Sequence, residues 1–166
     1  HKVEDATTAG STADFCMRNI RVPIVVVKKE SREGPKNYVM AVNSSNASKL
    51  GLDILYTLLT PKDSLTVINV YDDSMDAMGN MSFHSIRDYY VKELHDHCPT
   101  TFCKFEGVMR SGYESGVHAI NEYLSSIEED VDFLVIAPRA REDRSFSSFT
   151  EQVLLKVKTN IILCKL

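Results

Sequence analysis

The chain of 166 residues has no tryptophan, only five prolines, and no glycine after Gly116 among its seven. Its longest apolar run, Val22 to Val27, contains Pro23 and is far too short to cross a bilayer. Neither sign of charge dominates, because 19 basic and 23 acidic residues give a net charge of −4. These absences argue against a membrane protein, a collagen-like fibre and a polycation that binds nucleic acid.

The remaining composition, 43% apolar and 25% charged, is typical of a globular domain large enough to bury a core. The chain begins at His1 instead of methionine and opens with no signal-peptide pattern, so we expect an excerpt of a longer protein. Without a secretory signal, the four irregularly spaced cysteines indicate reduced thiols and a cytoplasmic location. They are Cys16, Cys98, Cys103 and Cys164.

Short apolar segments alternate with segments of helical period along most of the chain. Helices are predicted at residues 10–20, 45–59, 81–95, 114–127 and 148–157, and strands at 22–27, 38–42, 65–71, 102–109, 133–137 and 160–164. The last five strands predict an α/β fold with a five-stranded parallel, doubly wound, Rossmann-like sheet, because parallel neighbours need helical crossovers. Ligands bind such sheets beyond the carboxyl ends of the strands.

The two ends of the chain share a pattern. A shift of 137 positions places residues 10–28 on residues 147–165, helix on helix and strand on strand, with Lys28 on Lys165. We interpret residues 1–30 as the closing helix and strand of a preceding repeat. Residues 31–36, with Gly34 and Pro35, form the predicted linker, and residues 37–166 the complete domain.

Five motifs, in order, resemble the universal stress protein (UspA-like) family. Gly10–Ser11, a helix and the segment Val22–Lys28 are similar to that family's closing Gly-Ser, helix and Pro-Val-Val-Val segment. Residues 42–48 resemble its first strand-to-helix turn, Val-Asp-Gly-Ser-x-x-Ser, and residues 67–70 and 131–136 its second and fourth strands. The resemblance implies a tandem-repeat member with the fold of the adenine nucleotide alpha hydrolases.

The resemblance also implies where a nucleotide would bind, because some members hold ATP and others do not. Binders use an Asp for the ribose, an apolar residue at the adenine, and a Gly-x-x-Gly loop followed by Gly-Ser or Gly-Thr for the phosphates. The matching positions here are Asn43, Val70, Ala137, Arg139, Ala140, Ser147 and Ser148.

The residues at these positions weaken the phosphate site. Glycine lets the backbone reach positive φ or approach a phosphate closely, and a Cβ obstructs both. Pro138 removes an N–H donor, and Asn43 lacks the charge of a carboxylate. We therefore expect a member of the non-ATP-binding type with no cofactor. The alternative is ATP or AMP held by Arg139, Arg141 and Arg144, which otherwise solvate an exposed loop.

No residue set supports a catalytic assignment, so we do not expect an enzyme, and we assign no metal. His95 and His97 diverge at a helix end, and Cys98 and Cys103 lack the spacing of a zinc motif. We interpret His84 and His118 as lone histidines on helices, and Asp72, Asp73 and Asp76 as part of a polar loop.

The hypothesis that follows is a dimerisation, interaction or regulatory module in a stress response. Its expected partner is another universal-stress-type domain, bound through the last strands as a homodimer or pseudo-dimer. We predict that Val22–Val27 pairs with Asn160–Cys164, either within the chain or from a neighbouring copy, because apolar strand edges have to be covered.

Overall fold

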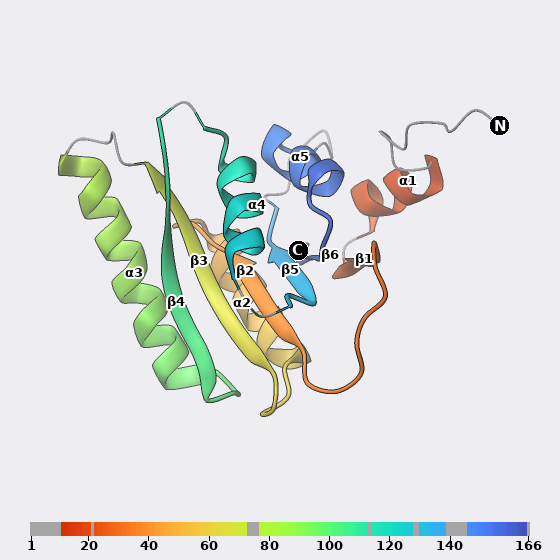
Figure 1. Cartoon of the computed structure of the whole chain (residues 1–166), viewed down its shortest axis with the longest axis horizontal. Coiled ribbons are helices and arrows are strands. Elements are labelled where there is room, and N and C mark those ends of the chain that lie inside the picture. The colour runs from red at the N-terminus through yellow and green to blue at the C-terminus, as the bar shows by residue number, and fades with distance from the viewer. Residues whose placement is uncertain are drawn as a thin grey trace.

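The computed structural model of the chain describes residues 11–20, 22–72, 77–112, 114–127, 130–138 and 146–165. From Asn37 onward, strands and helices alternate along these ranges (Figure 1). The helices are α1 (Ser11–Asn19), α2 (Asn46–Leu58), α3 (Ala77–His97), α4 (Gly116–Ser126) and α5 (Ser148–Lys156). The strands are β1 (Ile24–Val26), β2 (Asn37–Ala41), β3 (Ser64–Asp72), β4 (Phe102–Arg110), β5 (Phe133–Ile136) and β6 (Asn160–Leu163).

These strands form one sheet in the order β1-β6-β5-β2-β3-β4. Strands β2 to β6 are mutually parallel, as predicted, and the α/β doubly wound fold is confirmed. The sheet has six strands instead of five, because β1 adds to it antiparallel to β6. The predicted pairing of the two terminal strands is therefore confirmed within the chain.

Helices cover both faces of the sheet, and the sheet separates the core into two clusters. On one face, α2 and α3 contribute buried side chains such as Leu55 and Tyr90. On the other, α4, α5 and α1 contribute Ile120, Val153 and Met17. The central strands are buried on both sides for this reason, as near-continuous runs of branched apolar residues predict. Among the described residues, no helix is both long enough and apolar enough to cross a membrane.

Two element boundaries differ from the prediction. Helix α3 begins at Ala77, within the segment predicted as a polar loop. A first helical turn tolerates residues such as Gly79 and Asn80, because its N–H groups have no partner within the helix. Strand β1 is shorter than Val22–Val27, because Pro23 has no N–H to donate to a ladder.

The buried Asp63 organises the turn before β3. Its carboxylate accepts hydrogen bonds from the backbone N–H groups of Lys36 and Thr60, both at 2.7 Å. Burial on its own would raise the pKa of Asp63, but these hydrogen bonds favour the charged form and bring the pKa below its usual value.

The junction of β1 with β6 is symmetric under the shift of 137 positions. Val25 faces Ile162, its own counterpart, and the pairs on either side exchange under the same shift. Lys28 Nζ donates to the carbonyl groups of Leu154 and Val157 at the end of α5, the second at 2.6 Å. Lys165 Nζ donates in the same way to Met17 (2.6 Å) and Arg18 (2.9 Å) at the end of α1. Each lysine thus caps the helix of the other segment.

Candidate functional site

The carboxyl ends of β2 and β5 meet at the centre of the sheet, where the strand order reverses. The chain leaves β2 toward one face and β5 toward the other, which in doubly wound folds opens the ligand crevice. Asn43 follows β2, Val70 lies in β3, Ala137 follows β5, and Ser147–Ser148 begin α5. The topology therefore brings these predicted positions to one edge of the sheet, while Arg139 and Ala140 lie outside the described residues.

Asn43 uses its side-chain oxygen within its own loop. The Oδ1 atom accepts hydrogen bonds from the Ser45 N–H at 2.9 Å and from Ser48 Oγ at 3.0 Å, and Ser48 Oγ in turn accepts from the Asn43 N–H at 3.1 Å. This Asx-type turn fixes the start of α2, which Ser45 caps. Only the amide NH2 of Asn43 is then left for a ligand, and it can donate to a ribose hydroxyl but cannot accept from one.

Two residues that the sequence analysis did not single out, one in β3 and one in α3, hold this loop through its backbone carbonyl groups. The Tyr90 hydroxyl donates to the Asn43 carbonyl at 3.1 Å, and Asn69 Nδ2 donates to the Val42 carbonyl at 2.8 Å. Both side chains are buried, and burial raises the pKa of Tyr90, so its hydroxyl stays a donor. The available signal was a polar group at an apolar position, Asn69 within a buried strand and Tyr90 on the inner face of a helix.

Ala137 directs its side chain at α2 instead of into the crevice. A Cβ added to Gly51 on α2 would lie 2.6 Å from the Ala137 Cβ, so the helix and the end of β5 are nearly in backbone contact. Ala137 itself packs against the cluster formed with α2 and α3. This first position of the expected phosphate loop is therefore part of a helix–sheet contact.

Val70 is half-buried on the sheet face covered by α4 and α5, where it packs against their cluster beside Val108. An apolar side chain at the end of β3 could contact a base, as the resemblance implies. In the structure, its contacts are those of core packing.

The start of α5 is capped by its own serine. Ser147 Oγ accepts from the Thr150 N–H at 3.2 Å, and Ser148 is the exposed first residue of the helix. The preceding Phe146 is buried, with the cations of Arg18 and Lys165 at 5.5 and 5.3 Å from its ring centre. The three arginines of the alternative nucleotide site lie outside the described residues.

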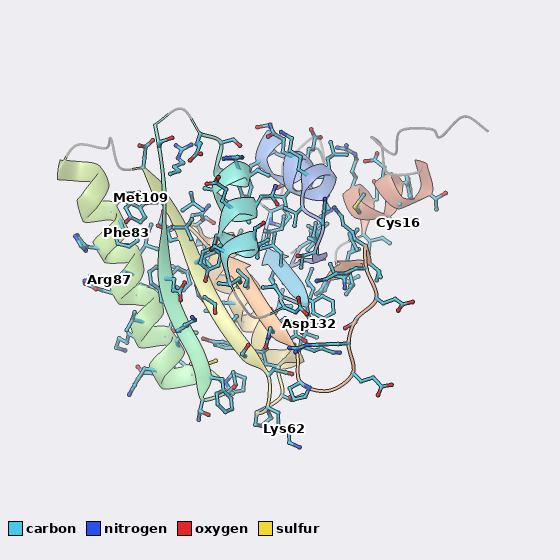
Figure 2. The ribbon with its side chains drawn as sticks, viewed as in Figure 1. Cys16, Lys62, Phe83, Arg87, Met109 and Asp132 are labelled. Carbon is cyan, nitrogen blue, oxygen red and sulfur yellow. The ribbon has the colours of Figure 1, made fainter. Side chains whose placement is uncertain are left out.

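A hollow lies at the opposite, amino-terminal end of the sheet. It has a volume of about 760 Å³, and Lys62, Thr66, Lys104 and Tyr123 are among its lining residues. Figure 2 shows Lys62 at this end and Met109 toward the carboxyl end. The hollow exists because α4 spans about 16 Å, whereas β3 and β4 are each about 30 Å long. No predicted site residue lines it.

A smaller hollow of about 210 Å³ lies beside the Asn43 loop, between α2 and α3. Ser44, Ser82 and Ser85 line it together with Lys49, whose Nζ lies 4.4 Å above the ring of Tyr89. Its volume is below the roughly 300 Å³ of a typical ligand pocket, so it would not enclose a nucleotide.

Two of the residues considered for metal or cation binding have other partners. His95 Nδ1 lies 2.8 Å from Asp96, and Asp72 pairs with Arg110 at 3.3 Å. Burial, followed by the neighbouring thiol of Cys103, raises the pKa of Cys98 to about 11. Asp73 and Asp76 lie outside the described residues.

Comparison with known proteins rests on structure alone, since no protein-family model and no curated protein matches the chain. A universal stress protein from Archaeoglobus fulgidus superposes with a TM-score of 0.60 at 14% identity, covering 77% of this chain and 92% of that one. A universal stress protein family member from Burkholderia pseudomallei gives 0.59 at 11%, covering 79% and 96%. A universal stress protein in complex with cAMP gives 0.57 at 16%, covering 79% and 97%. The chain therefore has the fold of the universal stress proteins.

Proposed function

We propose that residues 37–166 form a universal-stress-type domain with a degenerate nucleotide site, which acts as a dimerisation, interaction or regulatory module in a stress response. Its partner is a second domain of the same fold, which joins it through the terminal strands. Residues 1–30 are the closing helix and strand of that second domain, supplied by a preceding repeat. The predicted cytoplasmic location remains part of this proposal.

The observation that carries the proposal is unequal burial at equivalent positions. Val25 is 51% exposed, whereas its counterpart Ile162 is 4% exposed. Val27 is 73% exposed, whereas its counterpart Cys164 is 1% exposed. Ile162 and Cys164 belong to the cluster that α2 and α3 cover, and no described element covers Val25 in that way. A second domain would cover β1 with its equivalent of α2 and would place its equivalent of β5 beside β1. Val25 and Val27 would then be about as buried as Ile162 and Cys164.

Two further observations support the division of the chain. Lys28 caps α5 and Lys165 caps α1, so the segments α1–β1 and α5–β6 make equivalent contacts with each other. Residues 37–166 are 130 of 166 residues, or 78% of the chain. The superposed universal stress proteins cover 77% to 79% of this chain and nearly all of their own length, as expected if each matches one complete domain.

Loss of nucleotide binding is supported by the atoms of the crevice. The side-chain oxygen of Asn43 is occupied by its own loop, and Ala137 packs against Gly51 where a phosphate loop would need a free backbone. The second candidate is an AMP- or ATP-binding regulator in which arginines replace the glycine loop. The superposed universal stress protein that holds cAMP favours this alternative.

Self-association tests whether a second copy of this chain can cover β1. Analytical ultracentrifugation over a wide concentration range is expected to show dimers, because the exposed apolar face of β1 would be buried against a second copy. Replacing Val25 and Val27 together by Asp should weaken dimerisation at least tenfold. Phe102→Asp, at an equally exposed position on the opposite edge strand, is the control and should leave dimerisation unchanged. A monomer at every concentration, or equal effects of the two variants, would contradict burial of the β1 face against a second copy of this chain.

Bound nucleotide tests the degenerate site separately. Heat denaturation of the purified chain, followed by mass spectrometry of the supernatant, should release no adenine nucleotide. Millimolar ATP with Mg²⁺, AMP or cAMP should leave the melting temperature unchanged. Near-stoichiometric nucleotide would instead establish the regulator, and Arg139→Ala should then weaken binding more than tenfold, with added salt weakening it further.

A further inference from the structure

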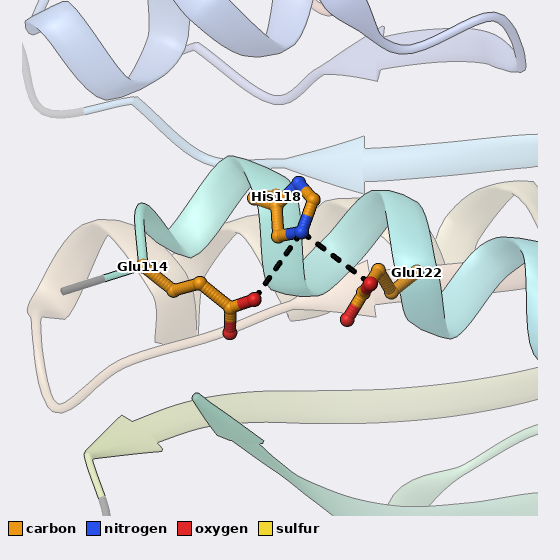
Figure 3. A group of neighbouring side chains, drawn as sticks. All are labelled: Glu114, His118 and Glu122. Atoms are coloured by element: carbon orange, nitrogen blue, oxygen red, sulfur yellow. Dashed lines mark ion pairs between the residues drawn. The ribbon is translucent and has the colours of Figure 1, made fainter. Parts of the chain in front are cut away.

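Three metal-ligating side chains converge on the outer side of α4. Glu114, His118 and Glu122 follow one another at intervals of four residues. His118 and Glu122 lie on one face of the helix, and Glu114 lies just before the N-cap residue Ser115 (Figure 3). His118 Nε2 lies 3.2 Å from Glu114 Oε1 and 3.4 Å from Glu122 Oε1. One ligand atom from each residue can be chosen so that all three lie within 4.8 Å of one another.

The charge of this cluster favours a cation. Two carboxylates share one imidazole, and within the described part of the chain neither forms an ion pair with a lysine or arginine. The nearby Arg110 is directed elsewhere, since it donates to the backbone carbonyl of Glu114 and pairs with Asp72. The Ser111 N–H donates to Glu114 Oε2 at 3.3 Å, which leaves Oε1 directed at the imidazole.

The spacing of these atoms matches a coordination sphere. Zn²⁺ binds imidazole nitrogen and carboxylate oxygen at about 2.0–2.2 Å, so neighbouring ligands of a tetrahedral ion lie about 3.3–3.6 Å apart. The two measured distances from Nε2 are close to this range. The Glu122 side chain is mostly exposed and free to rotate, so its carboxylate can move toward that of Glu114 to share one ion.

We propose that Glu114, His118 and Glu122 bind a divalent transition-metal ion of the Zn²⁺ class through His118 Nε2 and one oxygen of each glutamate. Water completes the coordination, because the cluster lies at the surface. His118 is then a metal ligand and not the lone surface histidine that the sequence suggested. His95 offers the contrast, since its one carboxylate neighbour, Asp96, is also paired with Lys92.

Titration with Co²⁺ as a spectroscopic probe tests this site on the intact chain. The wild type is expected to give the weak visible bands of nitrogen and oxygen ligation, without thiolate charge transfer. His118→Ala should weaken Co²⁺ binding at least tenfold, and Glu122→Gln should weaken it severalfold. His95→Ala is the matched control, an exposed histidine on another helix, and should bind as the wild type does.

Several results would overturn the proposal. These are no Co²⁺ or Zn²⁺ binding up to millimolar concentration, equal binding by wild type and His118→Ala, or a spectrum dominated by thiolate ligation. Circular dichroism of each variant separates loss of ligation from loss of folding. The two exposed substitutions on α4 are expected to leave the helical signal unchanged.

Discussion

Replacement of Gly51 by Ala tests how closely α2 approaches the sheet. The new Cβ would meet Ala137 Cβ at 2.6 Å, Met40 Cε at 3.2 Å and Cys164 Cβ at 3.4 Å. Non-bonded carbons prefer separations of about 3.5–4.0 Å, so the closest contact has to open by about 1 Å. The methionine end can move, but the Ala137 Cβ is fixed to its backbone. The helix itself would therefore have to shift away from the strands.

The sign of the effect follows from two opposing contributions. Alanine in a helix interior is favoured over glycine by about 1 kcal/mol. Overpacking of a tight core typically costs about 1–3 kcal/mol, and the rigid obstacle places this site toward the upper end. We expect Gly51→Ala to lower the free energy of unfolding by about 1–2 kcal/mol. Urea unfolding followed by circular dichroism would show a lower midpoint with an unchanged slope.

Two variants make the test specific. Gly116→Ala is the matched control on α4, because its Cβ would meet only the Phe149 ring, at 3.4 Å, and it should be neutral or slightly stabilising. Ala137→Gly removes the obstacle, so the double variant with Gly51→Ala should be more stable than the two separate effects predict. If Gly51→Ala stabilised the chain as much as Gly116→Ala does, the close contact would be refuted.

Three further predictions follow from other contacts. Lys28→Met and Lys165→Met should each lower the free energy of unfolding by about 0.5–1.5 kcal/mol, and effects differing more than threefold would contradict their equivalence. The lowered pKa of Asp63 gives stability that is present above its unfolded pKa of about 3.9 and is lost as pH falls through the folded value. Asp63→Asn should therefore destabilise the chain at pH 7 and reduce the loss on acidification, as urea titrations at several pH values would show. Tyr90→Phe should cost about 1 kcal/mol and speed amide exchange in the Asn43 loop, and unchanged exchange would contradict the positioning role.

The sequence was sufficient for the architecture because each level of pattern agreed. Branched apolar runs such as Phe133–Ile136 become strands buried on both faces, and serines placed before amphipathic segments become helix caps. The start of α3 was not predicted, since propensity is a weak guide in a first turn whose N–H groups need no helical partner. The sheet has six strands because the predicted pairing of the two terminal strands forms within the chain.

The candidate site was predicted only in part. Topology alone places Asn43 and Ala137 at one edge, so their proximity could be expected from the strand order. Their contacts could not be predicted from the sequence. They depend on the Asn43 side chain accepting a hydrogen bond from the Ser45 N–H and on α2 coming within contact distance of Ala137. The acidic cluster at His118 was missed for a similar reason, since its partners lie four residues away in both directions and separately look like ordinary helix-surface glutamates.

If the proposed second domain covers β1, unequal burial at equivalent positions indicates which element of that domain lies over this strand. On the face of α1 and α5, Ile24 and Val26 already pack against the shared core cluster, because each segment brings its own closing helix. On the opposite face, Ile162 and Cys164 are covered by helices of the cluster that includes α2, whereas Val25 is half exposed. The closing helix and strand alone therefore satisfy one face only. Under the proposed function, the partner covers the other face with a helix equivalent to α2, which favours a whole domain of this fold over a short peptide added to the edge.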